Sequence, residues 1–206
     1  MYACIVAPGN FELGIECARA FSPHLEENPP DCVIFDVRGL ETLFGPQVRL
    51  AETISRRIGV PASIAIASNP DAAHHAARGI RGVTVIPRGT EAEALAKLPL
   101  NLLPCKPQTA ELLHLWGLRK FADLAALPPL GVAARLGDEG IYLQRLSRGE
   151  ESRQLRPVED PLLFEAAVEL EDPVEVLDSL SFVLSGMLKD VCEQLRFRAL
   201  STNQIT

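Results

Sequence analysis

Two kinds of hydrophobic pattern divide this sequence. Up to about residue 90, short apolar runs rich in β-branched residues alternate with stretches whose apolar residues recur every three or four positions. The first pattern is typical of buried strands and the second of amphipathic helices. Together they predict strands over 2–6, 32–37, 62–67 and 83–86, and helices over 11–20, 48–58 and 71–78. Alternating strands and helices indicate an α/β or α+β fold for this part.

From Pro107 onward the pattern becomes purely helical. Short amphipathic segments are separated by glycines or by the pair Pro128-Pro129. They predict helices over 109–116, 121–127, 132–136 and 141–147. Helices of this length are marginal in isolation, so we expect them to pack against one another.

The last part of the chain predicts an incomplete domain. Residues 162–169 alternate as a strand does, and Asp172, Pro173 and Glu175 form the start of a long helix with a capping box. Its apolar positions recur at helical spacing and predict one buried face: Val176, Leu177, Leu180, Val183, Leu184, Met187, Leu188, Val191, Cys192 and Leu195. The final residues, 203–206, resemble the beginning of another strand. One strand, one helix and a strand stub cannot close a core, so this domain looks truncated.

Composition and charge narrow the classes of function. The 206 residues include 20 Lys and Arg against 27 Asp and Glu, a net charge of −7. That balance argues against a protein that coats nucleic acid by bulk charge. Residues 61–150 hold 10 basic and 8 acidic side chains, so a polyanion would meet this part of the chain.

The five cysteines and the apolar runs predict a cytoplasmic location. The cysteines are widely spaced and form no C-x-x-C pair, so a zinc ribbon or a redox motif has no support. Buried free thiols in a reducing cytosol explain them. No apolar run reaches the roughly 18 residues that a membrane span requires, and the N-terminus lacks the pattern of a signal peptide.

A basic hairpin is the sharpest local signal for binding. Gly117, Leu118, Arg119 and Lys120 connect two predicted helices, as in a helix-hairpin-helix. A glycine hairpin lets backbone N–H groups approach a phosphate, and the two cations add favourable charge. Such contacts reach the nucleic-acid backbone and read no sequence. The same residues also fit a purely structural αα-corner, in which Gly117 is the C-cap of the first helix.

No complete catalytic constellation is visible. Asp31 and Asp36 point to opposite faces of one strand and lie roughly 16 Å apart, so they cannot share a metal ion. Cys32 is a soft ligand that does not suit Mg²⁺. His74 and His75 are adjacent in a helix and face different ways. We therefore expect no metal site and no cofactor.

Four segments carry a resemblance to a known family. They are FSPHLEENPPDCVIFDVRGLETLFG, SIAIASNPDAAHHAARGIRGVTVI, LPLNLLPCKPQTAELLHLWGLRKFADLAALP and LGDEGIYLQRLSRGEE. In this order they resemble the Y-family (UmuC/DinB-type) translesion DNA polymerases, and most closely the catalytically inactive ImuB-like subunit. The resemblance implies an α+β fold with a reduced palm without fingers over 1–100. A helix-hairpin-helix thumb over 101–150, a linker over 151–157 and the N-terminal part of a little-finger domain over 158–206 would follow.

Departures from the family pattern imply the loss of polymerase activity. Active members hold two Mg²⁺ ions with an aspartate in the first palm strand and a later Asp-Glu pair. Here the first strand, 1–6, contains no carboxylate, and the pair aligns to Asp31-Cys32. Asp31 is thus a vestigial position, while Asp36 matches a structural aspartate and Asn69-Pro70 lacks the family's lysine. Only about fifteen residues stand where the fingers domain would lie, too few for such a domain.

The resemblance then implies a non-catalytic adaptor in DNA repair and translesion synthesis. Its partners would be the backbone of primer-template DNA, a sliding clamp and a catalytic replicative-type polymerase, and it would be cytoplasmic and associated with the nucleoid. DNA affinity should be weak and sensitive to salt. Two alternatives stay open. One is an active minimal Mg²⁺ nucleotidyltransferase that uses Asp31 with Glu26 or Glu27, and the other is a fragment without independent function.

Overall fold

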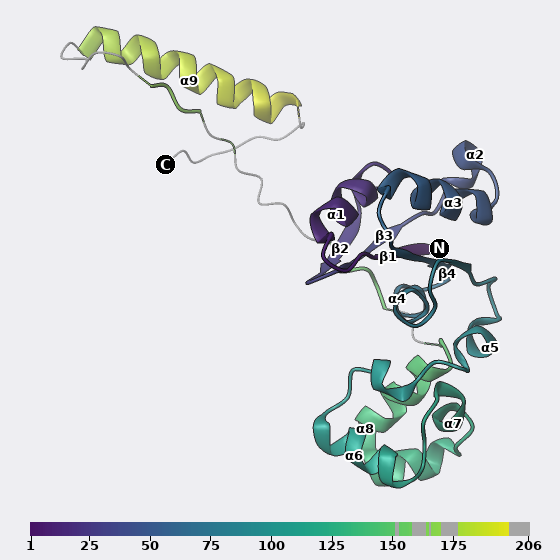
Figure 1. Ribbon diagram of the computed structural model, residues 1–206. Coiled ribbons are helices and arrows are strands. Elements are labelled where there is room, and N and C mark those ends of the chain that lie inside the picture. Colours follow the sequence, from purple (N-terminus) through teal and green to yellow (C-terminus); the bar gives the residue numbers. More distant parts are fainter. Residues whose placement is uncertain (151–152, 158–163, 165, 170–176, 198–206) are drawn as a thin grey trace. The chain divides into compact units, whose positions relative to one another are not determined.

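A five-stranded mixed sheet forms the centre of the first of two compact units. The computed structural model describes residues 1–150, 153–157, 164, 166–169 and 177–197, and its units are Met1–Val158 and Glu159–Thr206 (Figure 1). The strand order is β2-β3-β1-β4-β5, and only the pair β4–β5 is parallel. The strands are β1 (Tyr2–Val6), β2 (Leu25–Asn28), β3 (Cys32–Asp36), β4 (Ser63–Ala67) and β5 (Val83–Val85). The predicted α+β class is confirmed.

Different helices cover the two faces of the sheet. Alternate residues of each central strand belong to two separate core clusters, as the two-residue period of a strand requires. One face packs against α1 (Phe11–Arg19) and α3 (Gln47–Ile58), with α2 (Glu41–Phe44) beside α3. The other face packs against α4 (Pro70–Gly79).

A helical lobe follows β5 and completes the first unit. It consists of α5 (Glu91–Leu95), the 3-10 helix η1 (Leu100–Leu102), α6 (Pro107–Leu115), α7 (Phe121–Ala125) and α8 (Pro129–Ser147) (Figure 1). Phe121, Leu124 and Leu143 are fully buried in the same cluster as Cys4 and Ile34 of the sheet. The lobe and the sheet therefore share one hydrophobic core.

The predicted elements up to residue 127 are present, with ends within two residues of the prediction. Four short elements, β2, α2, α5 and η1, were not predicted. The reason is clearest for β2, whose sequence Leu-Glu-Glu-Asn lacks apolar alternation. It is an edge strand that pairs only with β3, so its position depends on that pairing and not on a hydrophobic pattern of its own.

The two glycines of α8 have different roles. The predicted break at Gly137 is present, because its φ of +62° is not helical and divides α8 into two helical segments. Gly140 is buried in the second segment, and a Cβ there would lie 2.9 Å from a methyl group of Val132 and against Leu136 of the first. Gly140 is thus needed for close packing of the two segments and, unlike Gly137, does not interrupt the helix.

The second unit contains the long helix α9 (Leu177–Phe197). The predicted capping residues, Asp172, Pro173 and Glu175, and the stub at 203–206 lie outside the described residues. Residues 164 and 166–169 of the predicted strand are not in a strand, and no described strand pairs with them. The predicted buried face is wrong for most of its length: Leu177 and Leu184 are 74% and 53% exposed, because no described element covers them. Among described residues of that face, only Leu195 is buried.

None of the helices in the described part of the chain is both long and apolar enough to cross a membrane.

Candidate functional site

Asp31, for which the family resemblance implied a vestigial position, is held in an ion pair. It lies where β3 begins, beside the end of β1, and its carbonyl oxygen accepts a hydrogen bond from the N–H of Ala7 at 2.8 Å. Nη2 of Arg78, from α4, donates to Oδ1 of Asp31 at 2.8 Å. The arginine neutralises the carboxylate from the side of α4. Within the described residues, no three His, Cys, Asp or Glu side chains are placed to hold a metal ion.

Asp31, Glu26 and Glu27, the residues of the alternative ligand set, each have a separate ion-pair partner. In β2, Glu26 pairs with Ile34 and Glu27 with Val33, so the two glutamates point to opposite faces of the sheet. The partners are Arg78 for Asp31, Arg153 for Glu26 and Arg19 for Glu27. A divalent cation at Asp31 would have to compete with Arg78, and a hard cation requires several converging oxygens.

Asp36 has the structural role that was predicted for it. It lies at the opposite end of β3 from Asp31. Its carboxylate accepts hydrogen bonds from the backbone N–H of Arg38 at 2.9 Å and from the Arg38 guanidinium. The contact closes the turn that follows β3.

Two thiols occupy the sheet beside Asp31. Sγ of Cys4 and Sγ of Cys32 are 3.4 Å apart, and both side chains are fully buried. The hydrogen bond with Cys4 lowers the pKa of the Cys32 thiol, as do His74 and Arg78, against the effect of burial. Burial raises the pKa of Cys4 well above its ordinary value. This corner of the sheet therefore holds soft sulfur atoms, whereas Mg²⁺ needs oxygen ligands.

The rings of the two adjacent histidines lie beside each other, with centroids 5.4 Å apart, and each has a further partner of its own. His74 accepts a hydrogen bond from Nε of Arg78 at 3.0 Å. His75 is buried and meets the ring of Phe121 edge-on, with centroids 5.4 Å apart. Burial lowers the pKa of His75 to about 3, so its imidazole is neutral at physiological pH.

An ion-pair cluster that the sequence did not suggest anchors the segment after α8. We call Arg153, Glu26 and Asp71 the Arg153 junction. The guanidinium of Arg153 donates to both oxygens of Glu26 at 2.6 and 2.9 Å, and its Nε donates to Asp71 at 2.8 Å. Its partners are 127 and 82 positions away, so no local pattern predicts the contact. The junction ties this segment to the sheet edge and to α4.

The junction makes stability depend on pH. Burial would raise the pKa of Glu26, but hydrogen bonds from Arg153, from the Arg156 N–H and from Asn28 lower it below 4.5. A carboxylate with a depressed folded-state pKa stabilises the fold above its unfolded pKa and loses that effect as pH falls. We therefore expect the stability gap between wild type and Glu26→Gln to shrink as pH falls from about 5 to about 3.

Urea unfolding at several pH values, followed by Trp116 fluorescence, measures that gap. Glu111→Gln is the control, since Glu111 is exposed on α6 and has no described contact. A gap that stayed constant down to pH 3 would show that the charge of Glu26 contributes nothing to the junction.

The hairpin between α6 and α7 uses its own backbone donors. The N–H groups of Arg119 and Lys120 both donate to one carboxylate oxygen of Asp123, each at 2.8 Å. Those of Gly117 and Leu118 donate to carbonyl oxygens at the end of α6. Because all four are occupied internally, a phosphate here would meet the side chains of Arg119 and Lys120 and not free backbone donors.

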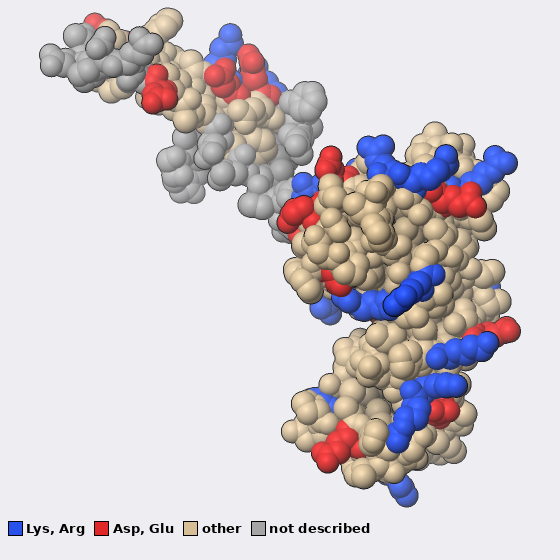
Figure 2. All heavy atoms as spheres, in the orientation of Figure 1, with Lys and Arg blue, Asp and Glu red and all other residues tan. Residues whose placement is uncertain are grey.

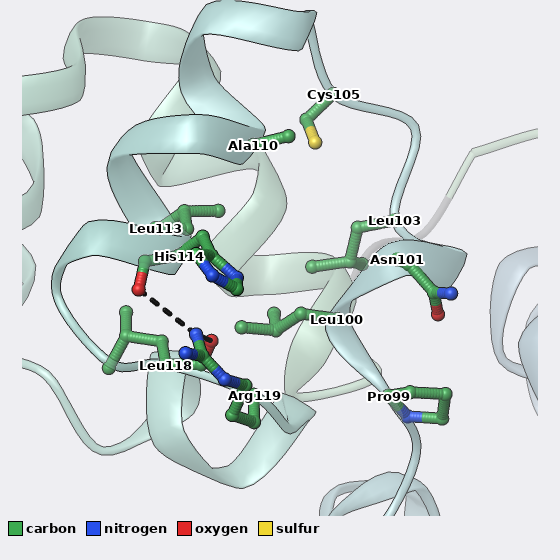
Figure 3. Close-up of a pocket in the computed structure, with 10 residues that line it drawn as sticks. All are labelled: Pro99, Leu100, Asn101, Leu103, Cys105, Ala110, Leu113, His114, Leu118 and Arg119. Atoms are coloured by element: carbon green, nitrogen blue, oxygen red, sulfur yellow. Dashed lines mark hydrogen bonds between the residues drawn. The ribbon is translucent and has the colours of Figure 1, made fainter.

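The side chains of the two hairpin cations differ in how they are held. Nη1 of Arg119 donates to the carbonyl oxygens of His114 and Leu118 at 2.9 and 3.1 Å, beside an apolar cavity of about 500 Å³ (Figure 3). Lys120 is exposed to solvent. Gly117 has φ +79°, which a glycine adopts at no steric cost. The face that Figure 2 displays carries both basic and acidic side chains. It therefore shows no continuous basic patch of the kind that binds nucleic acid by charge alone.

Comparison with known proteins identifies the relatives of this chain. It is 36% identical over 148 residues to DNA polymerase IV of Dehalococcoides mccartyi (strain CBDB1), covering 68% of this chain and 37% of that protein. It is 31% identical over 169 residues to DNA polymerase IV of Caulobacter vibrioides, covering 78% and 42% respectively. This chain thus spans less than half the length of these two relatives. No protein-family model matches the sequence.

The fold leads to the same group of proteins. The crystal structure of DinB from Sulfolobus solfataricus superposes with a TM-score of 0.56 at 19% identity, over 73% of this chain and 48% of that one. A Y-family polymerase chimera, Dbh-Dpo4(243-245)-Dbh, superposes with a TM-score of 0.51 at 15% identity, over 72% and 47%. The chain is therefore a homologue of DNA polymerases IV and has, over most of its length, the fold of part of a Y-family DNA polymerase.

Proposed function

We propose that this chain is a non-catalytic, ImuB-like homologue of the Y-family polymerases, acting as a DNA- and partner-binding adaptor in translesion synthesis. One observation carries the proposal: Asp31, at the position of a catalytic carboxylate, is ion-paired to Arg78 and adjoins two buried thiols. Two-metal phosphoryl transfer needs carboxylates that clamp the attacking and leaving oxygens. The described residues around Asp31 offer sulfur and guanidinium groups instead.

DNA would lie against the hairpin formed by Gly117, Leu118, Arg119 and Lys120. The support is the solvent exposure of Arg119 and Lys120 between α6 and α7. Contacts from these side chains would reach phosphates and would not read the sequence. With a net charge of −7 and two cations at the hairpin, affinity would be weak and would fall with salt.

The protein partners rest on the family resemblance. They would be a sliding clamp and a catalytic replicative-type polymerase, which would supply the nucleotide transfer that this chain lacks. The place of action would be the cytoplasm, at the nucleoid.

A salt series of fluorescence anisotropy on a labelled primer-template tests the DNA contact. The variant is Arg119→Glu/Lys120→Glu, and the control is Arg49→Glu/Arg56→Glu, which makes the same charge change on α3. We expect the hairpin variant to bind at least tenfold more weakly and to lose about two units of salt slope, since about 0.9 unit is lost per phosphate contact. Equal losses in both variants, or no binding by wild type at low salt, would overturn the placement of DNA at the hairpin.

A primer-extension assay tests the absence of catalysis. The chain is incubated at high concentration with primer-template, nucleotides and Mg²⁺ or Mn²⁺. We expect no incorporation. Incorporation that disappears in Asp31→Asn would establish the alternative of an active minimal polymerase and refute the adaptor role.

A further inference from the structure

A second hollow lies on the helical lobe, next to the basic hairpin. Its volume is about 340 Å³, and it is lined by Trp116, Leu118, Leu127, Pro128, Gly131 and Arg135, together with Val132. We call it the Trp116 hollow. Trp116 is half-buried: it packs against the shared core and also lines the hollow.

The hollow combines a flat aromatic wall with a cation. The guanidinium carbon of Arg135 lies 5.6 Å from the centroid of the Trp116 ring. Arg135 is exposed, and no hydrogen bond or ion pair of its side chain is present among the described residues. A planar group that stacked on Trp116 would therefore displace Arg135 without breaking another contact. None of the lining residues is acidic.

The neighbouring charges fit a nucleotide. Arg119 and Lys120 follow Trp116 by three and four positions, at the tip of the same hairpin. An aromatic wall beside cations is the arrangement that proteins use for single-stranded nucleic acid, where bases stack and phosphates meet the cations. A buried aliphatic side chain of a protein partner would make no use of these charges.

Gly131 lines the hollow. It lies in the first turn of α8, and a Cβ at this position would meet no heavy atom within 4 Å. A side chain can therefore begin at this position without a clash. The position offers a way to fill the hollow while leaving Trp116 and every cation unchanged.

We propose that the Trp116 hollow binds one unpaired nucleobase of single-stranded DNA, stacked on Trp116, while Arg119, Lys120 and Arg135 face its flanking phosphates. This inference rests on the proposed DNA-binding function and adds to it a preference for single-stranded over duplex DNA. The chain would then hold the unpaired template beside the primer end by a base contact as well as by charge.

Trp116 is the only tryptophan in the chain, so the tryptophan fluorescence comes from a residue that lines the hollow. The full chain is titrated with a short oligothymidylate, with a blunt duplex of equal length, and with an abasic oligonucleotide that keeps the phosphates. Anisotropy of an end label reports total binding in the same samples. We expect the oligothymidylate to quench Trp116 at least twofold, and the duplex and the abasic strand to quench it little.

Two variants separate stacking from charge. Gly131→Leu fills the hollow and should abolish quenching, although Trp116 is still present. Trp116→Ala should weaken binding of the oligothymidylate about five- to a hundredfold, the range measured for loss of one base–aromatic stack, and should leave binding of the abasic strand unchanged. Far-ultraviolet circular dichroism shows whether each variant is folded.

The outcomes distinguish this inference from the proposed function. Binding of the oligothymidylate without a change in Trp116 fluorescence would overturn the base pocket and leave DNA binding intact. Equal quenching by the abasic strand would overturn it too, since phosphates alone would then account for the signal. No binding of any oligonucleotide at low salt would overturn both.

Discussion

Phe121→Ala is expected to lower the unfolding free energy of the Met1–Val158 unit by about 4 kcal/mol, within the range for removing a buried aromatic ring. Phe121 is fully buried at the first position of α7, where it meets His75 of α4 edge-on. It belongs to the core that the sheet and the helical lobe share. The cavity would therefore weaken the attachment of the hairpin to the sheet as well as the lobe itself.

Urea unfolding followed by Trp116 fluorescence measures this loss in the unit that contains the mutation. Phe182→Ala is the matched control, because Phe182 is 81% exposed on α9 of the second unit. That control should change the unfolding free energy by less than about 0.5 kcal/mol. A loss below about 1 kcal/mol for Phe121→Ala would mean that the lobe and the sheet do not depend on a common core.

Arg153→Met should destabilise the same unit by about 3 kcal/mol. Removing the arginine leaves Glu26 and Asp71 as two uncompensated carboxylates with side chains only 8% and 11% exposed. Breaking a buried ion pair from one side costs about 3–5 kcal/mol. We place the effect at the low end because the side chain of Arg153 keeps 22% of its surface in solvent.

Two further variants in the same unfolding experiment separate the effect of unpaired charge from the effect of losing the Arg153 contacts. Arg156→Met is the control, since Arg156 contacts Glu26 through its backbone N–H and not through its side chain. The triple variant Glu26→Gln/Asp71→Asn/Arg153→Met should be more stable than Arg153→Met alone, because it leaves no unpaired charge. If the triple variant were the less stable of the two, unpaired charge would not be the cause of the loss.

The strands and most helices of the first unit could be predicted from the sequence because their signals are local. Residues 32–35 form a continuous apolar run, which predicts a strand buried on both faces. Gln47–Ile58 repeats apolar residues at helical spacing, which predicts a helix and its buried side. The edge strand β2 could not be found in this way, because two of its four residues are glutamates. Glu26 is buried there with its charge paired to Arg153, a residue that follows α8 in the sequence.

The candidate site was predictable in part. The absence of a carboxylate in 1–6 and the presence of Cys32 directly after Asp31 are visible in the residues themselves. The pairing of Asp31 with Arg78 is not, because it depends on α4 packing across the sheet, 47 positions along the chain. Similarly, the sequence Gly117–Lys120 suggests backbone donors for a phosphate, but Asp123 folds back and takes two of them.

The sequence by itself therefore indicated an α/β or α+β fold for the first part of the chain, the order of the predicted strands and helices, and the residue types near Asp31. Only the tertiary structure decided which charges neutralise one another, that the lobe shares its core with the sheet, and that Trp116 and Arg135 meet beside the hairpin. The physical reason is the distance along the sequence between the residues that interact. Hydrophobic periodicity acts within one element and is written in consecutive residues. Ion pairs, close packing and stacked rings join residues whose proximity exists only after the chain has folded.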